Sequence, residues 1–311
     1  MNEIVIPCTD LDEAIKFFTE RLGFRVDMIM PADEPSVAVI SGHGQTIRLE
    51  KSEPPAARST DTVGIPLISL AADAIWSAGR AGMSYRDLIP GRLGGRVVAS
   101  QIRLAAGGEV ADYVHYHKVA FQMIYCSSGR VKVVYEDHGD PFWLEPGDCV
   151  LQPPEMRHRV LECEPDTEVI ELSSPASHET WADHEMNLPT RRMIPDRIFG
   201  GQRFAHHKAA DAQPMPGGFG NFDTYDTGIH DASNGAARVL ELRTRAQHAS
   251  ASIRARSDAA TFCFVLYGAL FAAVAPNLKC NLNRSDSITV LPGLDIELAA
   301  PANAKILCVI V

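Results

Sequence analysis

Three histidines are the residues of this chain best suited to chemistry. His115 and His117 flank Tyr116, and His158 follows about forty residues later, shortly after Gly147. Residues i and i+2 of a β-strand point to the same face, so His115 and His117 can share one side of a strand. Three neutral imidazoles can bind a transition metal and leave coordination positions open, which is typical of a catalytic metal.

Other polar residues near these histidines are candidates for the same site. Gln122 can supply an amide oxygen as a fourth ligand, and it would leave the metal more positive than a glutamate would. The alternative is that Gln122 only forms hydrogen bonds within its domain. Tyr113 lies two positions before His115 and is expected to share its face, as a proton donor. Further candidate donors or carboxylate-binding groups are Tyr125, Gln101, Arg103 and Arg96, and the alternative for each is a position at the surface or rim.

Composition and charge narrow the partners and the compartment. The chain has 311 residues, of which 46% are hydrophobic and 22% charged, and its formal net charge is −10. These values are typical of a globular protein and argue against nucleic acid or an anionic membrane as partner. No apolar run approaches the roughly 18 residues that span a bilayer, and the acidic start is unlike a signal peptide. Seven cysteines without a C-x-x-C pair suit a reducing compartment, so we expect a cytoplasmic protein with a small-molecule substrate.

The chain divides into segments with different patterns. Residues 1–55 predict a single small α+β module of the βαβββ type, with an amphipathic helix after the first strand. Residues 56–95 begin with a stretch rich in proline, serine and threonine and are interpreted as a linker. Short alternating strands separated by turn residues occupy residues 96–175 and again residues 217–311, with a connector at 176–216. The predicted fold is therefore mainly β, with two antiparallel barrels after the module.

The N-terminal string TDLDEAIKFFTERLGFRVD resembles the βαβββ module of the vicinal oxygen chelate superfamily, the glyoxalase and bleomycin-resistance group. That family builds a metal site from two such modules, whereas one is found here, without the family's histidine near the start. Glu50 stands where the family often places a carboxylate ligand, but a single carboxylate makes no metal site. A lone module leaves a sheet edge open, so it should pack on the barrels or pair with its copy, and we expect a homodimer.

The histidine motif resembles those of the cupins, whose domains are double-stranded β-helix barrels of the jelly-roll type. The first cupin motif corresponds to GEVADYVHYHKVAFQMIYCSSG, residues 108–129, and the second to GDCVLQPPEMRH, residues 147–158. Spacing agrees through both motifs, although Gln122 replaces the family's acidic ligand and Glu155 replaces a turn glycine. The resemblance implies a bicupin with one divalent transition metal in the first barrel, and Fe, Mn, Ni, Zn or Cu would suit the ligands. The implied ligands are His115, His117, Gln122 and His158.

The second barrel is predicted to lack a metal site. Alignment on Gly268 places Arg254 and Arg256 at the positions of the histidine pair and Ile296 at the position of His158. Burying two like charges without counterions is costly, so the arginines are expected to be exposed or paired with an acid such as Asp258. This barrel is therefore interpreted as a degenerate cupin with a structural role.

Two classes of function remain open from the sequence. The first is a metal-dependent cupin enzyme acting on a small organic substrate, most simply an Fe(II)-type dioxygenase in which Tyr113 and Gln122 assist catalysis. A non-redox isomerase, lyase or hydrolase could use the same metal as a Lewis acid. The second is a non-catalytic bicupin that binds or senses a small molecule.

Overall fold

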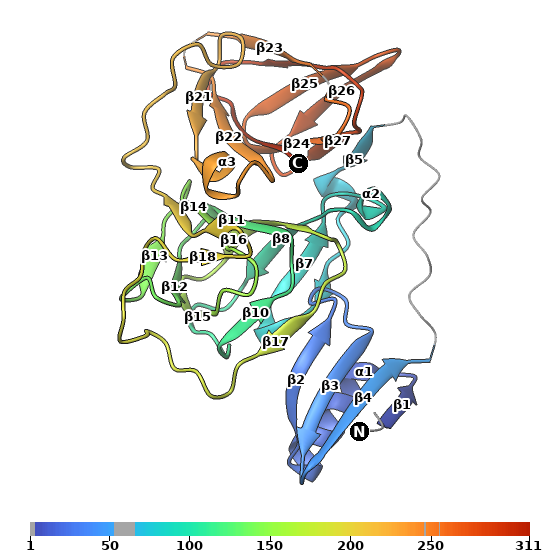
Figure 1. Cartoon of the computed structure of the whole chain (residues 1–311). Coiled ribbons are helices and arrows are strands. Elements are labelled where there is room, and N and C mark those ends of the chain that lie inside the picture. Colours follow the sequence, from blue (N-terminus) through green and yellow to red (C-terminus); the bar gives the residue numbers. More distant parts are fainter. Residues whose placement is uncertain (1–3, 53–65, 246, 255) are drawn as a thin grey trace.

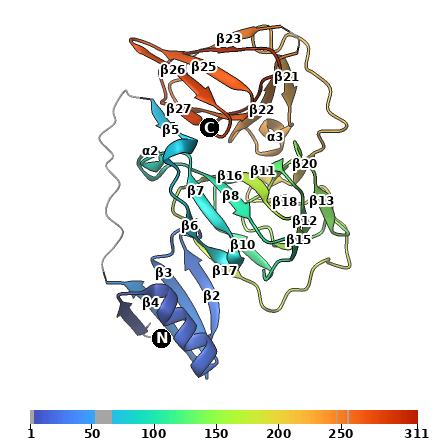
Figure 2. The ribbon, with the colours of Figure 1, turned by 180° about the vertical axis from the view of Figure 1, so that it is seen from behind.

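A computed structural model describes residues 4–52, 66–245, 247–254 and 256–311 (Figure 1). Two barrels lie one above the other, and a smaller module lies at the far side of the first barrel, as both views show (Figures 1 and 2). The fold is mainly β, with an α+β module followed by two jelly rolls, as predicted. No helix within the described ranges is long and apolar enough to cross a bilayer.

The N-terminal module forms the predicted βαβββ unit. Its helix α1 (Leu11–Lys16) begins at Asp10, whose side chain accepts a hydrogen bond from the backbone N–H of Glu13 at 2.9 Å, and it continues as a π-helical turn over Phe17–Arg21. Leu11, on the buried face of the helix, packs in one cluster with Ile40 and Leu49 of the sheet. The sheet runs in the order β1 (Ile4–Cys8), β4 (Gln45–Lys51), β3 (Val37–Gly42) and β2 (Arg25–Met30).

The sheet of this module continues into the first barrel of the same chain. Strand β2 pairs with β17 (Thr180–Ala182), with Ile29 opposite Thr180. Strand β17 pairs in turn with β10 (His115–His117), so the histidine strand is the second neighbour of β2. The sheet then passes through β15 (His158–Cys163), β12 (Val131–Tyr135) and β13 (Phe142–Leu144), with β9 (Gly108–Glu109) on β15.

The second sheet of the first barrel lies between the sheet that carries the three histidines and the second barrel. Its order is β20 (Ala205–His207), β14 (Cys149–Leu151), β11 (Phe121–Ser128), β16 (Thr167–Ser174), β8 (Val98–Leu104), β7 (Ser84–Asp87) and β6 (Ser77–Ala78). Successive side chains on β11 alternate between the barrel interior and the other barrel. Phe121, Met123 and Tyr125 face the second barrel, and Gln122 and Ile124 face inward.

The barrels exchange strands through segments expected to be connections. Residues 53–65, at the start of the expected linker, lie outside the described residues. Further along this segment, β5 (Leu67–Ser69) pairs with β27 of the second barrel, whereas β6 and β7 belong to the first. The connector after β17 returns β20 to the first barrel, where His207 lies opposite Cys149. The same segments contain 3₁₀ turns at Ala71–Asp73 and Arg80–Gly82, the short helix α2 (Arg92–Gly95) and the hairpin of β18 (Ile198–Phe199) and β19 (Gln202–Arg203).

The second barrel is filled by aliphatic side chains. Ile296, at the position that aligns with His158, is buried in this core. Arg256 is exposed and pairs with Asp258 at 3.1 Å, and Arg254 is also exposed, as predicted. One sheet of this barrel has the strand order β21 (Asp223–Asp226), β22 (Arg238–Arg243), β29 (Lys305–Ile310), β24 (Thr261–Tyr267), β27 (Ser287–Val290) and β5. The other has the order β23 (Ala249–Ile253), β28 (Ile296–Ala300), β25 (Ala269–Val274) and β26 (Leu278–Asn283). The short helix α3 (Ile229–Ala232) packs beside these sheets.

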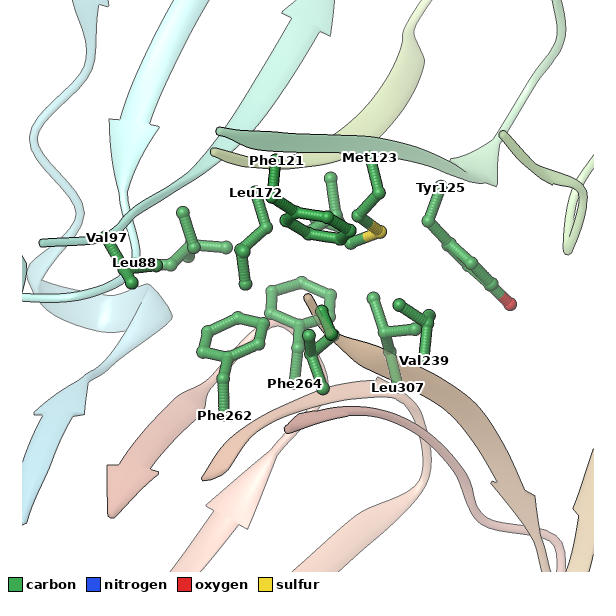
Figure 3. Packing of buried hydrophobic residues seen from close by; sticks show 14 of the residues in the cluster. Leu88, Val97, Phe121, Met123, Tyr125, Leu172, Val239, Phe262, Phe264 and Leu307 are labelled. Atoms are coloured by element: carbon green, nitrogen blue, oxygen red, sulfur yellow. The ribbon is translucent and has the colours of Figure 1, made fainter. Parts of the chain in front are cut away.

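A shared apolar core holds the barrels together (Figure 3). Phe121, Met123 and Leu172 of the first barrel point toward Phe262 and Phe264 of the second. The interface also contains a buried acid, because the Glu241 carboxylate accepts a hydrogen bond from the Tyr125 hydroxyl and pairs with Lys305 at 2.8 Å. Burial of these aromatic and aliphatic faces on both sides makes the pair of barrels one packing unit.

Phe262→Ala should destabilise both barrels together. The ring is fully buried in the shared core, so its removal leaves a cavity and should cost about 3–5 kcal/mol in the free energy of unfolding. Urea unfolding followed by tryptophan fluorescence, whose reporters lie outside the second barrel, would measure the shift. Phe271→Ala, on the partly exposed face of β25, is the control and should cost less than about 1 kcal/mol. An equal midpoint for the Phe262 variant and the unchanged protein would contradict a shared core.

Candidate metal centre

The three histidines of the motif meet at the wall of the first barrel. His115 and His117 lie on one face of β10, and the pairing of β10 with β15 places His158 directly opposite His115. The ring centroids of His115 and His158 are 4.2 Å apart, and each lies 5.2 Å from that of His117. One nitrogen of each ring falls within 4.8 Å of the others. All three side chains are buried, between 1% and 6% exposed.

Hydrogen bonds to Nδ1 orient these rings. Nδ1 of His115 lies 2.8 Å from the carbonyl oxygen of Tyr113, and Nδ1 of His158 lies 2.9 Å from that of Met156. A carbonyl oxygen only accepts, so both Nδ1 atoms carry the proton and the neutral rings present Nε2 as a lone pair. Nδ1 of His117 is held at 2.9 Å by the hydroxyl of Thr180, on β17.

A buried carboxylate supports the first histidine. Asp112 Oδ1 lies 3.6 Å from Nδ1 of His115, and the same side chain accepts hydrogen bonds from the backbone N–H groups of Tyr113 and Val160. Second partners of this kind fix the orientation of metal-binding histidines and raise their basicity. The tethered Nδ1 atoms and converging rings therefore fit a divalent transition metal, with His115, His117 and His158 as its holders.

The structure places Gln122 and Tyr113 beside the histidines rather than in the cavity wall. Gln122 points inward from β11 and is buried, but its amide nitrogen donates to Oε1 of Glu171 at 3.2 Å. The ring of Tyr113 packs edge-on to His115, with centroids 6.0 Å apart. In the described part of the chain, the residues lining the cavity include the three histidines but neither Gln122 nor Tyr113.

Four further candidates from the sequence point away from the cavity. Tyr125 and Gln101 lie on the face of the second sheet opposite the barrel interior, where Tyr125 binds Glu241 and Gln101 donates to Glu168. Arg103 also pairs with Glu168, at 2.7 Å, and Arg96 donates to a nearby carbonyl. None of the four is among the described residues that line the cavity: strand parity directs Tyr125, Gln101 and Arg103 away from the interior, and Arg96 precedes β8.

A small, mostly apolar cavity opens beside the histidines. Its volume is about 80 Å³. One water needs roughly 10–15 Å³ on the same measure, so there is room for several waters or a small organic group. Most of the lining is aliphatic and comes from the inward positions of β8, β11, β12, β15 and β16, for example Val98, Ile124 and Val133. Such walls exclude bulk water and strengthen polar interactions at the metal centre.

Sequence reasoning missed several polar residues of this cavity, among them Glu171 and His178. Glu171 lines it from β16, and burial raises the pKa of its carboxyl above the ordinary value, an effect opposed by His178, Gln122 and Ser173. His178 lines it from the segment after β16, with its ring centroid 5.5 Å from that of His117. Glu171 could have been found, because a lone acid between Ile170 and Leu172 interrupts an apolar strand. His178 carries no comparable local signal.

The N-terminal module also contributes to the wall of this cavity. Ala32 and Asp33, in the loop between β2 and β3, line the cavity of the first barrel. Asp33 forms an ion pair with Arg92, which also pairs with Asp87 at 3.3 Å. Both partners of Arg92 are largely buried, so this loop is held against the barrel by ionic contacts that solvent screens weakly. The site is therefore assembled from the module and the barrel together.

Comparisons with known proteins agree with this architecture. Residues 101–173 match the model of the cupin domain, and residues 1–87 match that of the glyoxalase/bleomycin resistance protein/dioxygenase superfamily. The first barrel is therefore similar to a cupin domain, and the N-terminal module is similar to the glyoxalase-type superfamily. No curated protein shows a significant match.

Solved structures share the double-barrel fold. The protein Ylba from E. coli has a TM-score of 0.55 and 11% identity, covering 79% of this chain and 90% of its own. A deletion mutant of oxalate decarboxylase OxdC from Bacillus subtilis has a TM-score of 0.55 and 11% identity, covering 83% of this chain and 79% of its own. The structure of oxalate decarboxylase from Bacillus subtilis at pH 4.6 has a TM-score of 0.54 and 13% identity, covering 83% of this chain and 78% of its own. The fold of this chain is thus that of a bicupin, and at such low identity the likeness extends to the fold alone.

His158→Ala should remove the metal and leave the fold intact. Two imidazoles cannot replace three, so metal retained by the purified protein should fall from near one equivalent to below about one tenth, as elemental analysis would measure. His230→Ala, at a half-exposed position in the second barrel, is the control and should keep the metal. Unchanged metal content in the His158 variant, with both proteins showing the same circular dichroism, would contradict this ligand set.

Proposed function

We propose that this protein is a metal-dependent enzyme acting on a small organic substrate. The observation that carries the proposal is the convergence of three buried imidazoles, with nitrogen atoms within 4.8 Å of one another, on a cavity of about 80 Å³. A metal that only held the fold would be closed by a fourth protein ligand. Here the fourth candidate, Gln122, is not among the described residues that line the cavity, and its amide nitrogen is bound to Glu171.

Each residue of the site would have a separate role in holding the metal, orienting its ligands or donating a proton. His115, His117 and His158 would hold the ion, and Thr180, Met156 and Tyr113 would fix the three rings through Nδ1. A divalent metal bound there would supply Lewis-acid or redox chemistry to a substrate that enters its open positions. Gln122 would orient the Glu171 carboxylate, and Tyr113 remains the predicted proton donor at the edge of the site.

The finer form of the proposal is an Fe(II)-type dioxygenase. Neutral imidazoles suit Fe(II), and open positions are needed for a chelating substrate and for O₂. The aliphatic lining from β8, β11, β12 and β16 suits the apolar part of a small substrate and an apolar gas, and it keeps bulk water from reactive species. Both atoms of O₂ would enter the organic product.

A non-redox enzyme is the second candidate, and a particular observation favours it. Glu171 and His178 line the same cavity as the three imidazoles, so groups able to accept protons lie within the site. With a Lewis-acid metal, such groups suit isomerisation, elimination or hydrolysis. A binding or sensing role without catalysis is an outcome that the assay below would reveal.

The expected homodimer and the cytoplasmic location stay predictions. The edge of the N-terminal module at β2 is paired with β17 in the same chain, so this edge needs no second copy. The edge at β1 carries the exposed side chains of Ile4 and Val5 and is the surface on which we would expect a second copy to pair. Light scattering would distinguish the mass of a monomer from that of a homodimer.

Iron-loaded protein should consume O₂ when a suitable small chelating substrate is present. With a panel of diketones, catechols and hydroxy acids, an oxygen electrode should record uptake coupled one to one to product, absent in the His158→Ala variant. Anaerobic turnover to the same product would overturn the dioxygenase and support the non-redox enzyme. Stoichiometric binding without turnover in air or argon, whichever metal is loaded, would contradict an enzyme and support a binding protein.

A further inference from the structure

His178 presents a hydrogen-bonding atom that no protein group satisfies. Its side chain is 6% exposed, and its Nε2 is buried without a hydrogen-bond partner among the described residues. Nδ1 lies 2.9 Å from the carbonyl oxygen of Pro175, so Nδ1 carries the proton and Nε2 of the neutral ring is an acceptor. A buried polar atom without a partner is costly, and this one belongs to a residue that lines the cavity.

Glu171 adds a second acceptor to the same wall. Gln122 and Ser173 both donate to its Oε1, at 3.2 and 3.1 Å, and the described contacts leave Oε2 without a hydrogen bond. The carboxylate lines the cavity with His178. A ligand in the cavity therefore meets both the imidazoles of the metal site and these hydrogen-bond acceptors, and the ring centroid of His178 lies 5.5 Å from that of His117.

The lining of the cavity includes two acids and, among the described residues, no lysine or arginine. The acids are Glu171 and Asp33, and the carboxylate of Asp33 is paired with Arg92 behind the lining. A small dianion such as oxalate would meet the carboxylate of Glu171 and the imidazole lone pair of His178 at this wall, although the hydroxyl groups of Tyr85, Ser100 and Tyr135 and the amide of Gln152 elsewhere in the lining can donate hydrogen bonds. Such contacts between acceptors are unfavourable in a site of low polarity.

We propose that the substrate carries an N–H or O–H donor, which binds the acceptor wall formed by His178 and Glu171 while its other end chelates the metal. This inference rests on the proposed metal-dependent function and names the chemical class of its substrate: a small chelating molecule with a hydrogen-bond donor, uncharged or cationic at that end. His178 is then a specificity-determining residue, because a ligand without the donor leaves Nε2 buried and unsatisfied.

A matched pair of chelators tests this assignment. Acetohydroxamic acid and N-methylacetohydroxamic acid bind metals through the same two oxygens, but only the first retains an N–H donor. Titration into Co(II)-loaded full-length protein, followed by the visible absorption of the metal, gives both Kd values without catalysis. The unchanged protein should bind acetohydroxamic acid on the order of tenfold more tightly than the N-methyl compound.

Variants separate the hydrogen bond from the bulk of the extra methyl group. His178→Phe keeps a ring and removes the acceptor, so its ratio of Kd values should fall to about one. His178→Gln keeps an acceptor and should retain a preference. His138→Phe is the matched control, because its Nε2 is also buried and unpartnered but lies outside the cavity lining, and its ratio should match the unchanged protein.

The outcomes bear on different parts of the account. Failure of the unchanged protein to bind Co(II) would overturn the proposed function and this inference with it. Binding of Co(II) with equal ratios in the unchanged protein and the His178→Phe variant would overturn the inference and leave the metal site standing. Loss of Co(II) from a folded His178→Phe variant would also overturn it, because His178 would then be a metal ligand.

Discussion

The antiparallel pairing of β10 with β15 is the contact on which the rest of the site depends. It places His115 opposite His158, and the alternation of side chains along β10 adds His117 to the same face. β17, on the other side of β10, brings Thr180 to Nδ1 of His117. A slip of one residue in either pairing would turn the ligands or their supports to the opposite face of the sheet. The register of these short strands is therefore a functional constraint as well as a structural one.

The N-terminal module gains a role from the same sheet. Because β2 pairs with β17, the module is fixed two strands from the histidines, and its loop reaches the cavity with Ala32 and Asp33. The partner surface of this single module is supplied by the first barrel of the same chain. The Asp33–Arg92–Asp87 contacts hold that loop, so a change in the module can alter the metal cavity without touching a ligand. The second barrel contributes differently, by burying the outer face of the sheet whose inner face lines the cavity.

Local pattern predicted the fold class and the histidine cluster, because both follow from strand periodicity and short-range spacing. The βαβββ module and the two jelly rolls were visible in the sequence for the same reason. The positions of β5 in the second barrel and of β20 in the first were not visible in the sequence. β5, for example, pairs with residues more than two hundred positions away. Gln101 and Arg103 could only be candidates for the cavity, because the sequence does not show which face of β8 is internal. His178 was missed because its place in the wall depends on the return of the chain past β10, a tertiary contact without a local signal.

X-ray absorption at the edge of the metal retained by purified protein tests the central claim most directly. The account predicts a first shell with three imidazole nitrogens, at about 2.0–2.1 Å if the metal is zinc, together with lighter oxygen scatterers at the open positions. A shell with sulfur scatterers, a shell with fewer than three imidazoles, or a protein that retains no metal after purification and reconstitution would contradict it.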